Sequence, residues 1–190
     1  MKILEEHILY NGKWVQLKER IYIDTKGNKR SWTFIGRRNQ QKASVIVPVT
    51  KESGALILIQ QYRIPFGQYL YEFPAGLIDP GEKPEEAAIR ELSEETGYQG
   101  KVDRISPEIA SSSGLASETI YMVYMTVEEE PSMKPEHEGS EKISVFKLLP
   151  RDINTFIENC VKSKYLLDAK LYVYLVNKSN MLPSKLDSAL

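Results

Sequence analysis

This chain of 190 residues contains little cysteine and carries almost no net charge. The one cysteine, Cys160, cannot form an internal disulfide and is compatible with a reducing compartment. The formal net charge is −1, so no global field draws the protein to nucleic acid or to an anionic membrane. The composition therefore argues against a disulfide-rich secreted domain and against a nucleic-acid-binding protein.

Long apolar runs are missing as well. No run approaches the roughly 18 residues of a membrane span, and the acids Glu5 and Glu6 stand where a signal peptide would be apolar. We expect a cytoplasmic protein without a membrane segment. Histidine is also rare: His7 and His137 are expected at the surface, and no Ser/His/Asp or Cys/His set for nucleophilic catalysis is evident.

What remains is an ordinary globular composition, 42% hydrophobic and 27% charged. The length fits one domain with a small appendage. The appendage is predicted at the N-terminus, over residues 1–42, as an antiparallel β meander too short to form a good core alone. Its strands are expected at 8–10, 14–18, 20–24 and 29–36, with Asn11-Gly12 as a hairpin turn.

Residues 43–190 are predicted to form the main domain. Strands interleaved with helices indicate an α/β fold in which a mixed β-sheet lies between helical layers. Pro48 has no N–H to donate, so the first strand is expected to end or bulge there. The strands are expected at 43–49, 55–63, 69–75, 102–109, 120–127 and 143–149, and the helices at 84–96, 150–162 and 168–178.

One stretch, residues 76–98, passes from a glycine loop into a helix. Asp79-Pro80-Gly81 is typical of a turn, because proline pre-sets φ and glycine permits a positive φ. Pro84 suits the first helical turn, where a missing N–H costs nothing. Gly97 is expected to end the helix in the left-handed conformation.

Three acids of this helix, Glu91, Glu94 and Glu95, follow the spacing i, i+3, i+4 and so share one face. Like charges at this spacing repel, and a bound cation would convert the repulsion into coordination. Oxygen ligands suit Mg²⁺, with Mn²⁺ as a possible substitute, and Mg²⁺ commonly also binds substrate phosphates. The alternative is a solvated acidic helix face, which leaves the glycine loop unexplained.

The order Gly76, Glu82, Arg90-Glu91-Leu92, Glu94-Glu95, Gly97-Tyr98 resembles the Nudix box, which fixes nine positions over 23 residues. The resemblance implies a Nudix fold and divalent-metal hydrolysis of a nucleoside diphosphate linked to another moiety. Within it, the carbonyl of Ala75 with Glu91 and Glu95 matches the metal ligands, and Glu94 lies beside them. The structural positions of the box are Gly76, Glu82, Arg90 and Gly97.

The flanks, from Gly12 to about Asn180, are similar to the ADP-sugar pyrophosphatases, Nudix enzymes that hydrolyse ADP-ribose. The similarity is carried by Gly12-Lys13-Trp14-Val15, Trp32, Gln61-Tyr62-Arg63, residues 72–76 and Asp168-Ala169. It implies a homodimer with exchanged N-terminal sheets. It also implies that Trp14 and Trp32 sandwich the adenine, since base stacking on aromatic rings is favourable.

Further substrate contacts follow from the same resemblance. Arg37 matches a base-edge contact and Arg63 a residue near the pyrophosphate, while Gly114 and Glu118 belong to a substrate-binding loop. Ser113-Gly114 stands where the family usually has Pro-Gly, so a hydroxyl replaces a rigid ring at the pocket expected for the terminal sugar.

The resemblance also assigns the general base, a loop glutamate that takes a proton from the attacking water. Either Glu141, which we favour, or Glu138 fills this role, with Glu94 as a further catalytic candidate.

Two other functions remain open. The first is a pyrophosphatase that prefers a GDP- or UDP-sugar, because Ser113 stands where the family usually has proline. A Nudix-fold sensor that binds ADP-ribose without cleaving it is the second, although all acids of the box are present.

Overall fold

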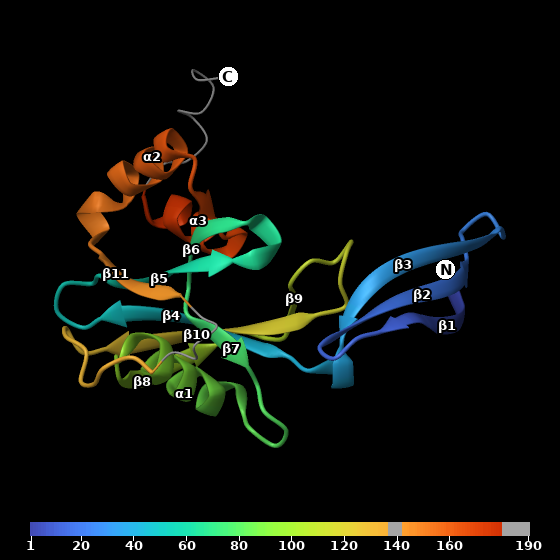
Figure 1. The fold of residues 1–190 in the computed structure, drawn as a ribbon, viewed down its shortest axis with the longest axis horizontal. Helices are drawn as coiled ribbons and strands as arrows, with labels where there is room; N and C mark the ends of the chain where they lie inside the picture. Colours follow the sequence, from blue (N-terminus) through green and yellow to red (C-terminus); the bar gives the residue numbers. More distant parts are fainter. Residues whose placement is uncertain (137–141, 180–190) are drawn as a thin grey trace.

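The computed structural model describes residues 1–136 and 142–179, which form two parts (Figure 1). A three-stranded N-terminal sheet projects from a larger body, and in that body a mixed sheet carries helices on both faces. Between the two parts runs a short 3-10 helix, η1 (Arg38–Gln40). Among the described residues, no helix combines the length and the apolarity that a membrane span requires.

The N-terminal sheet is antiparallel, with the order β1-β2-β3. Its strands are β1 (Lys2–Asn11), β2 (Val15–Ile23) and β3 (Lys29–Arg37). The Asn11-Gly12 turn is confirmed, since the Gly12 N–H donates to the Val15 carbonyl at 3.0 Å. Trp14 lies in the bend before β2, so its predicted place on a strand is wrong.

Two predicted strands, 14–18 and 20–24, are in fact the single strand β2, which pairs with β3 along its whole length. Polar residues occupy the middle of β2, and in the sequence they separate two shorter apolar segments. The Glu6 carboxylate of β1 accepts from Lys18 Nζ at 3.1 Å and from Arg20 Nε at 2.7 Å, so charge pairing stabilises that segment within the sheet.

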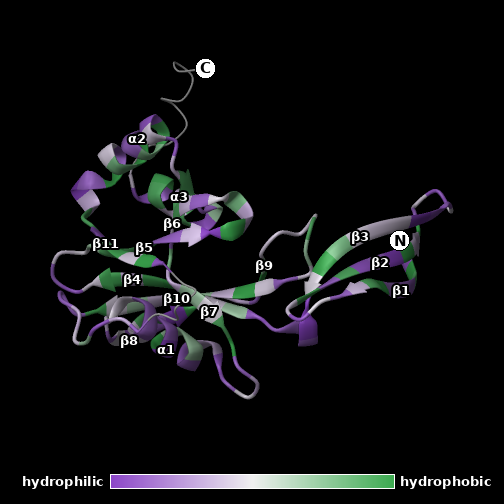
Figure 2. Ribbon diagram, in the orientation of Figure 1, coloured by the Kyte–Doolittle hydropathy of each residue, from purple (hydrophilic) through white to green (hydrophobic). Residues whose placement is uncertain are grey.

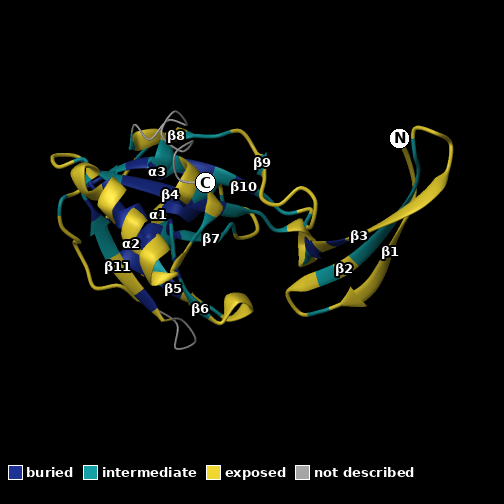
Figure 3. Cartoon of the chain, turned by 90° about the horizontal axis from the view of Figure 1, so that it is seen from above, coloured by how far each residue is buried: buried dark blue, intermediate teal, exposed yellow. Residues whose placement is uncertain are grey.

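Little of this sheet is covered within one chain, as Figure 3 shows. Every residue of β1 is exposed, whereas Phe34 of β3 is buried. Figure 2 shows apolar segments along its strands. Their exposed large side chains are Ile3, Leu4, Ile8, Leu9, Tyr10, Val15, Leu17, Trp32 and Ile35.

The main sheet has the order β12-β6-β5-β4-β10-β8, with β11 on β5, β7 on β4 and β9 on β10. Its centre is the parallel pair β4–β10, in register from Ala43–Ile120 to Thr50–Val127. Its strands are β4 (Ala43–Thr50), β5 (Leu56–Arg63), β6 (Gln68–Glu72), β7 (Ala75–Leu77), β8 (Gly100–Ile105), β9 (Ile109–Ala110), β10 (Thr119–Val127), β11 (Ile143–Leu148) and β12 (Leu166–Leu167).

The expected break at Pro48 is wrong, because β4 continues to Thr50 without a bulge. The N–H groups of Ile46 and Thr50 bond away from β10, to Pro74 and Ala55. Alternation places the nitrogen of Pro48 on that same side. There β4 pairs with β5 only at Val49, so no ladder bond is lost.

Two predicted strands are each divided in two. The first, 69–75, breaks at Phe73-Pro74 into β6 and β7, and the Pro74 carbonyl accepts from Ile46 N–H at 2.8 Å. The second, 102–109, breaks after β8. There Ser106 exchanges bonds with Met122 instead, donating its N–H and accepting at Oγ, both at 2.9 Å.

Helices cover both faces of the main sheet, which confirms the predicted α/β layers. The helix α1 (Pro84–Thr96) covers one face, and α2 (Ile153–Ser163) and α3 (Ala169–Lys178) cover the other. Ala88 and Leu92 of α1 pack on Ile46, Ile57 and Val123. The larger core cluster joins α2 and α3 to the opposite face, with Val45, Val47, Leu58, Phe73, Phe156, Leu171 and Leu175.

Candidate active site

The predicted glycine loop and helix form as the sequence indicates. Pro84 is the first residue of α1, and the Glu86 carboxylate accepts from the Lys83 N–H at 2.9 Å. Gly97 ends the helix with a φ of 74°. A Cβ at Gly97 would lie 2.1 Å from the Met133 carbonyl oxygen, so glycine is required there for two reasons.

Arg90 joins this helix to the loop before it. Its Nε and Nη2 donate to Glu82 at 3.0 and 2.9 Å, and Nη2 also donates to the Leu77 carbonyl at 3.1 Å. The Arg90 guanidinium lowers the pKa of Glu82. Glu86, one turn before Arg90, caps the start of the helix.

Glu91 packs directly on the backbone of Gly76. A Cβ at position 76 would lie 1.8 Å from Glu91 Cδ, which no side chain could tolerate. The same glutamate accepts from Arg90 Nη1 at 2.7 Å, so its carboxylate is held between strand β7 and the guanidinium. The absence of a side chain at Gly76 therefore sets the position of Glu91.

The other two acids differ in their surroundings. Glu95 is only 8% exposed, and its Oε2 accepts from the Ala75 N–H at 3.1 Å. Glu94 is exposed and accepts from Arg90 Nη1 at 3.3 Å. The predicted metal-ligating residues thus meet where α1 passes β7.

Among the described residues, no three acidic, histidine or cysteine side chains are already arranged to hold a metal ion. Arg90 contacts both Glu91 and Glu94 instead. The donor chemistry nevertheless fits a hard divalent cation, because Ala75 and the three carboxylates line one pocket and offer only oxygen.

This catalytic pocket has a volume of about 590 Å³. It brings together most of the predicted site residues: Trp14, Arg37, Arg63, Ala75, Gly76, Arg90, Glu91, Glu94, Glu95 and Glu118. It also contains residues that the sequence analysis missed as site residues, namely Glu72, Ser111, Glu136, Asp168 and Lys170. Two of these had a signal: Glu72 and Asp168 lie within motifs that carry the family resemblance.

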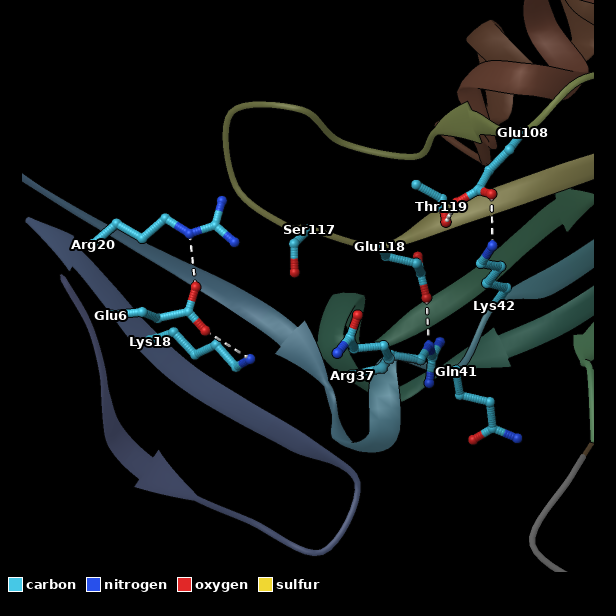
Figure 4. A pocket seen from close by; sticks show the side chains of 11 residues that line it. Glu6, Lys18, Arg20, Arg37, Gln41, Lys42, Glu108, Ser117, Glu118 and Thr119 are labelled. Atoms are coloured by element: carbon cyan, nitrogen blue, oxygen red, sulfur yellow. Dashed lines mark hydrogen bonds and ion pairs between the residues drawn. The ribbon is translucent and has the colours of Figure 1, made fainter. Parts of the chain in front are cut away.

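Ion pairs hold both predicted substrate-binding arginines. Arg63 donates from Nε and Nη2 to both carboxylate oxygens of Glu72, at 2.8 and 2.9 Å. Arg37 pairs with Glu118, which joins the end of β3 to the start of β10 (Figure 4). That pair borders a smaller cleft of about 290 Å³ beneath the N-terminal sheet, where Lys42 pairs with Glu108 at 2.5 Å.

Two predicted substrate-binding residues lie elsewhere. Trp32 lines a separate, largely apolar cavity of about 470 Å³, together with Tyr22, Phe34 and Ser113. Gly114 lies outside the catalytic pocket, and its carbonyl accepts from Trp32 Nε1 at 3.2 Å. Within one chain, Trp14 and Trp32 therefore belong to different cavities. The candidate bases Glu138 and Glu141 lie outside the described residues.

Comparison with known proteins agrees with this geometry. The profile of the NUDIX domain matches residues 40–159. The chain belongs to the NUDIX domain family. The predicted class, a Nudix hydrolase, is thereby confirmed, and Nudix hydrolases as a class use divalent metal ions.

Relatives of similar length support the assignment of this chain to the Nudix family. It is 34% identical over 184 residues to an ADP-sugar pyrophosphatase of Mus musculus, covering 90% of this chain and 84% of the relative. It is also 34% identical over 184 residues to an ADP-ribose pyrophosphatase of Bacillus subtilis, covering 90% of each. The crystal structure of an ADP compounds hydrolase has the same fold, with a TM-score of 0.67, 24% identity and coverage of 83% and 82%.

Proposed function

We propose that this chain hydrolyses the pyrophosphate of ADP-ribose, or of a related nucleoside diphosphate sugar, to a nucleoside monophosphate and a sugar phosphate. The observation that carries the proposal is the Glu91 carboxylate seated on Gly76, beside Glu95 and Ala75, in a pocket that also holds Arg63. The pyrophosphatases among its relatives support the choice of substrate class.

Magnesium is the proposed cofactor, with manganese as a possible substitute. Glu91, Glu94, Glu95 and the Ala75 carbonyl would hold it, and it would neutralise the diphosphate and activate water. Arg63, which Glu72 holds through two hydrogen bonds, would stabilise the negative charge that develops on the phosphates. Glu141, or Glu138 in its place, is the proposed general base.

A homodimer is part of the proposal. Trp14 and Trp32 line different cavities of one chain, so a base stacked between two tryptophans needs a second copy. The exposed apolar side chains of the N-terminal sheet fit burial against such a copy. Residues 1–42 are then the dimerisation unit and 43–190 the catalytic unit, and a cytoplasmic location remains a prediction from the sequence.

A substrate panel tests the proposal. The full-length chain is incubated with ADP-ribose, a GDP-hexose and a UDP-hexose, with Mg²⁺ or with EDTA, and the products are identified by mass. We expect AMP and ribose 5-phosphate from ADP-ribose, with Mg²⁺ only. Faster cleavage of a GDP- or UDP-sugar would make that compound, rather than ADP-ribose, the preferred substrate. Binding of ADP-ribose without any cleavage would make the protein a sensor.

A further inference from the structure

Two cationic side chains line the side of the catalytic pocket that lies away from α1. Glu91, Glu94 and Glu95 enter the pocket from α1, whereas Arg63 and Lys170 enter it from β5 and α3. In the view of Figure 1, α1 lies below β7 and α3 above it. We propose that Lys170 is a substrate-binding residue that contacts the diphosphate from the side opposite the three acids of α1, which deepens the function proposed above and rests on it.

Lys170 is held in place by its own helix. Asp168 is the N-cap of α3, and its Oδ1 accepts from the N–H groups of Lys170 and Leu171 at 2.9 and 3.4 Å. The other oxygen, Oδ2, accepts from Lys170 Nζ at 2.8 Å. Leu171 and Leu175 are completely buried and fix the helix on the sheet. The ammonium group therefore has a defined position at the pocket wall.

The Lys170–Asp168 pair lies next to the Arg63–Glu72 pair. Strand β12 runs parallel to β6, with Leu167 opposite Tyr71, and the Asp168 N–H donates to the Tyr71 carbonyl at 3.0 Å. Glu72, the next residue on β6, binds Arg63 through both of its oxygens. Two fixed acid–base pairs thus stand side by side on one wall of the pocket.

The charges of the two walls differ in a way that suits a diphosphate. The α1 wall offers carboxylates, which repel phosphate unless cations are held between them. The opposite wall carries Lys170 and Arg63, whose N–H groups can donate to phosphate oxygens, beside their partner carboxylates Asp168 and Glu72. A lysine ammonium is a compact charge with three donors, so Nζ can bind a phosphate oxygen while it still donates to Asp168. A diphosphate between the walls would be neutralised from both sides.

The competing explanation is that Lys170 only stabilises the helix start. The two explanations differ in what the variant Lys170→Met should change. A helix-stabilising role predicts a lower melting temperature and unaltered substrate affinity. Contact with the diphosphate predicts weaker binding and a smaller dependence of binding on salt, because one screened attraction is removed.

The test uses the full-length chain and the variants Lys170→Met, Lys170→Arg and Lys162→Met. Lys162 is a matched control, since it forms an i,i+4 pair with Glu158 on α2 and does not line the catalytic pocket. Steady-state kinetics with ADP-ribose are measured at two ionic strengths. Calorimetry with the non-hydrolysable α,β-methylene analogue of ADP-ribose, in the presence of Mg²⁺, supplies a binding readout that is independent of turnover.

We expect Lys170→Met to raise KM and the dissociation constant of the analogue about tenfold, or about 1.4 kcal/mol. Its kcat should change little, because the contact is present in ground and transition states alike. Lys170→Arg should retain most of the affinity, and Lys162→Met all of it. The salt dependence should fall only in Lys170→Met.

Unchanged KM, unchanged analogue affinity and unchanged salt dependence in a folded Lys170→Met protein would overturn the proposal. A wild type that binds the analogue but cleaves no substrate would refute the proposed hydrolysis, and the calorimetry would still decide the role of Lys170. A wild type that neither binds nor cleaves would refute both.

Discussion

The indole N–H of Trp32 donates a hydrogen bond of 3.2 Å to the backbone carbonyl of Gly114. Next to it, Ile35 of β3 and Ala116 form a parallel bridge, in which the Ile35 N–H donates to Leu115 and the Ser117 N–H donates to Ile35, both at 2.9 Å. The loop after β9 is thus attached to the N-terminal sheet of its own chain. Trp32 therefore has a positioning role besides any stacking role.

Variants of Trp32 separate these two roles. Trp32→Ala removes the ring and should cost ~1–3 kcal/mol of base stacking, a loss of roughly 5- to 150-fold in kcat/KM that appears mainly in KM. Trp32→Phe keeps a ring and loses only the bond to Gly114, so its KM should rise less. Kinetics with ADP-ribose measure both, and unchanged KM in folded Trp32→Ala would make the tryptophan purely structural.

Two glycines of the box should respond differently to alanine. In Gly76→Ala, the new Cβ displaces the Glu91 carboxylate, and an error of about 1 Å can cost roughly 100-fold in rate. In Gly97→Ala, the left-handed φ costs roughly 1–2 kcal/mol and the new Cβ also meets the Met133 carbonyl oxygen, so Tm should fall by at least several degrees. Turnover per folded molecule and thermal melts are measured for both variants. Equal losses of activity in the two would contradict the expected difference between a catalytic and a structural glycine.

Local signals in the sequence predicted the box well. The turn, the cap at Gly97 and the shared face of the three glutamates depend on residues close in sequence, so their geometry follows from local rules. Lys170 could not be placed this way, because its position depends on the register of β12 against β6. The same applies to Trp14 and Trp32, whose separation into two cavities depends on how the N-terminal sheet sits on the main domain.

Glu95→Gln should abolish metal-dependent turnover and leave the fold intact. The amide oxygen can still accept from Ala75, and the loss of a buried charge relieves repulsion with Glu91. We expect turnover to fall by roughly 100-fold, since metal catalysis is worth several kcal/mol. Without metal, Tm should equal or exceed that of the wild type.

The melting temperature also tests whether Glu95 binds the metal. A ligand that binds only the folded state raises Tm, so Mg²⁺ should stabilise the wild type and not Glu95→Gln. Glu85→Gln is the matched control, because Glu85 lies on the same helix but does not line the pocket. An active Glu95→Gln protein that EDTA does not inhibit would refute the metal site.

A truncation that starts at Gln41 tests the dimer. The buried core clusters contain no residue before Val45, so the shortened chain should still fold. We expect sedimentation to show a dimer for the full chain and a monomer for the truncation, whose KM should also rise. A monomeric full-length protein with normal activity would contradict the proposed dimer.

Glu129 should contribute to stability at neutral pH and lose that contribution in acid. Its carboxylate accepts from the N–H groups of Ser53 and Glu52, each at 2.8 Å, and pairs with Lys147 at 3.2 Å. The backbone bond from Ser53 is the main cause that lowers the pKa of Glu129 from 4.5 to about 2. A folded-state pKa below the unfolded value stabilises the protein above pH 4.5, and that stabilisation disappears as the pH falls towards 2.

Glu129→Gln isolates this carboxylate from the others that titrate in acid. The amide still accepts from the backbone but cannot ionise, so the variant should melt below the wild type at pH 7, and the two should converge between pH 4.5 and 2. Glu128→Gln is the control, because Glu128 is an exposed partner of Lys51 and its loss should change Tm little. A constant difference between wild type and Glu129→Gln across this range would mean that Glu129 stabilises the turn through shape rather than through charge.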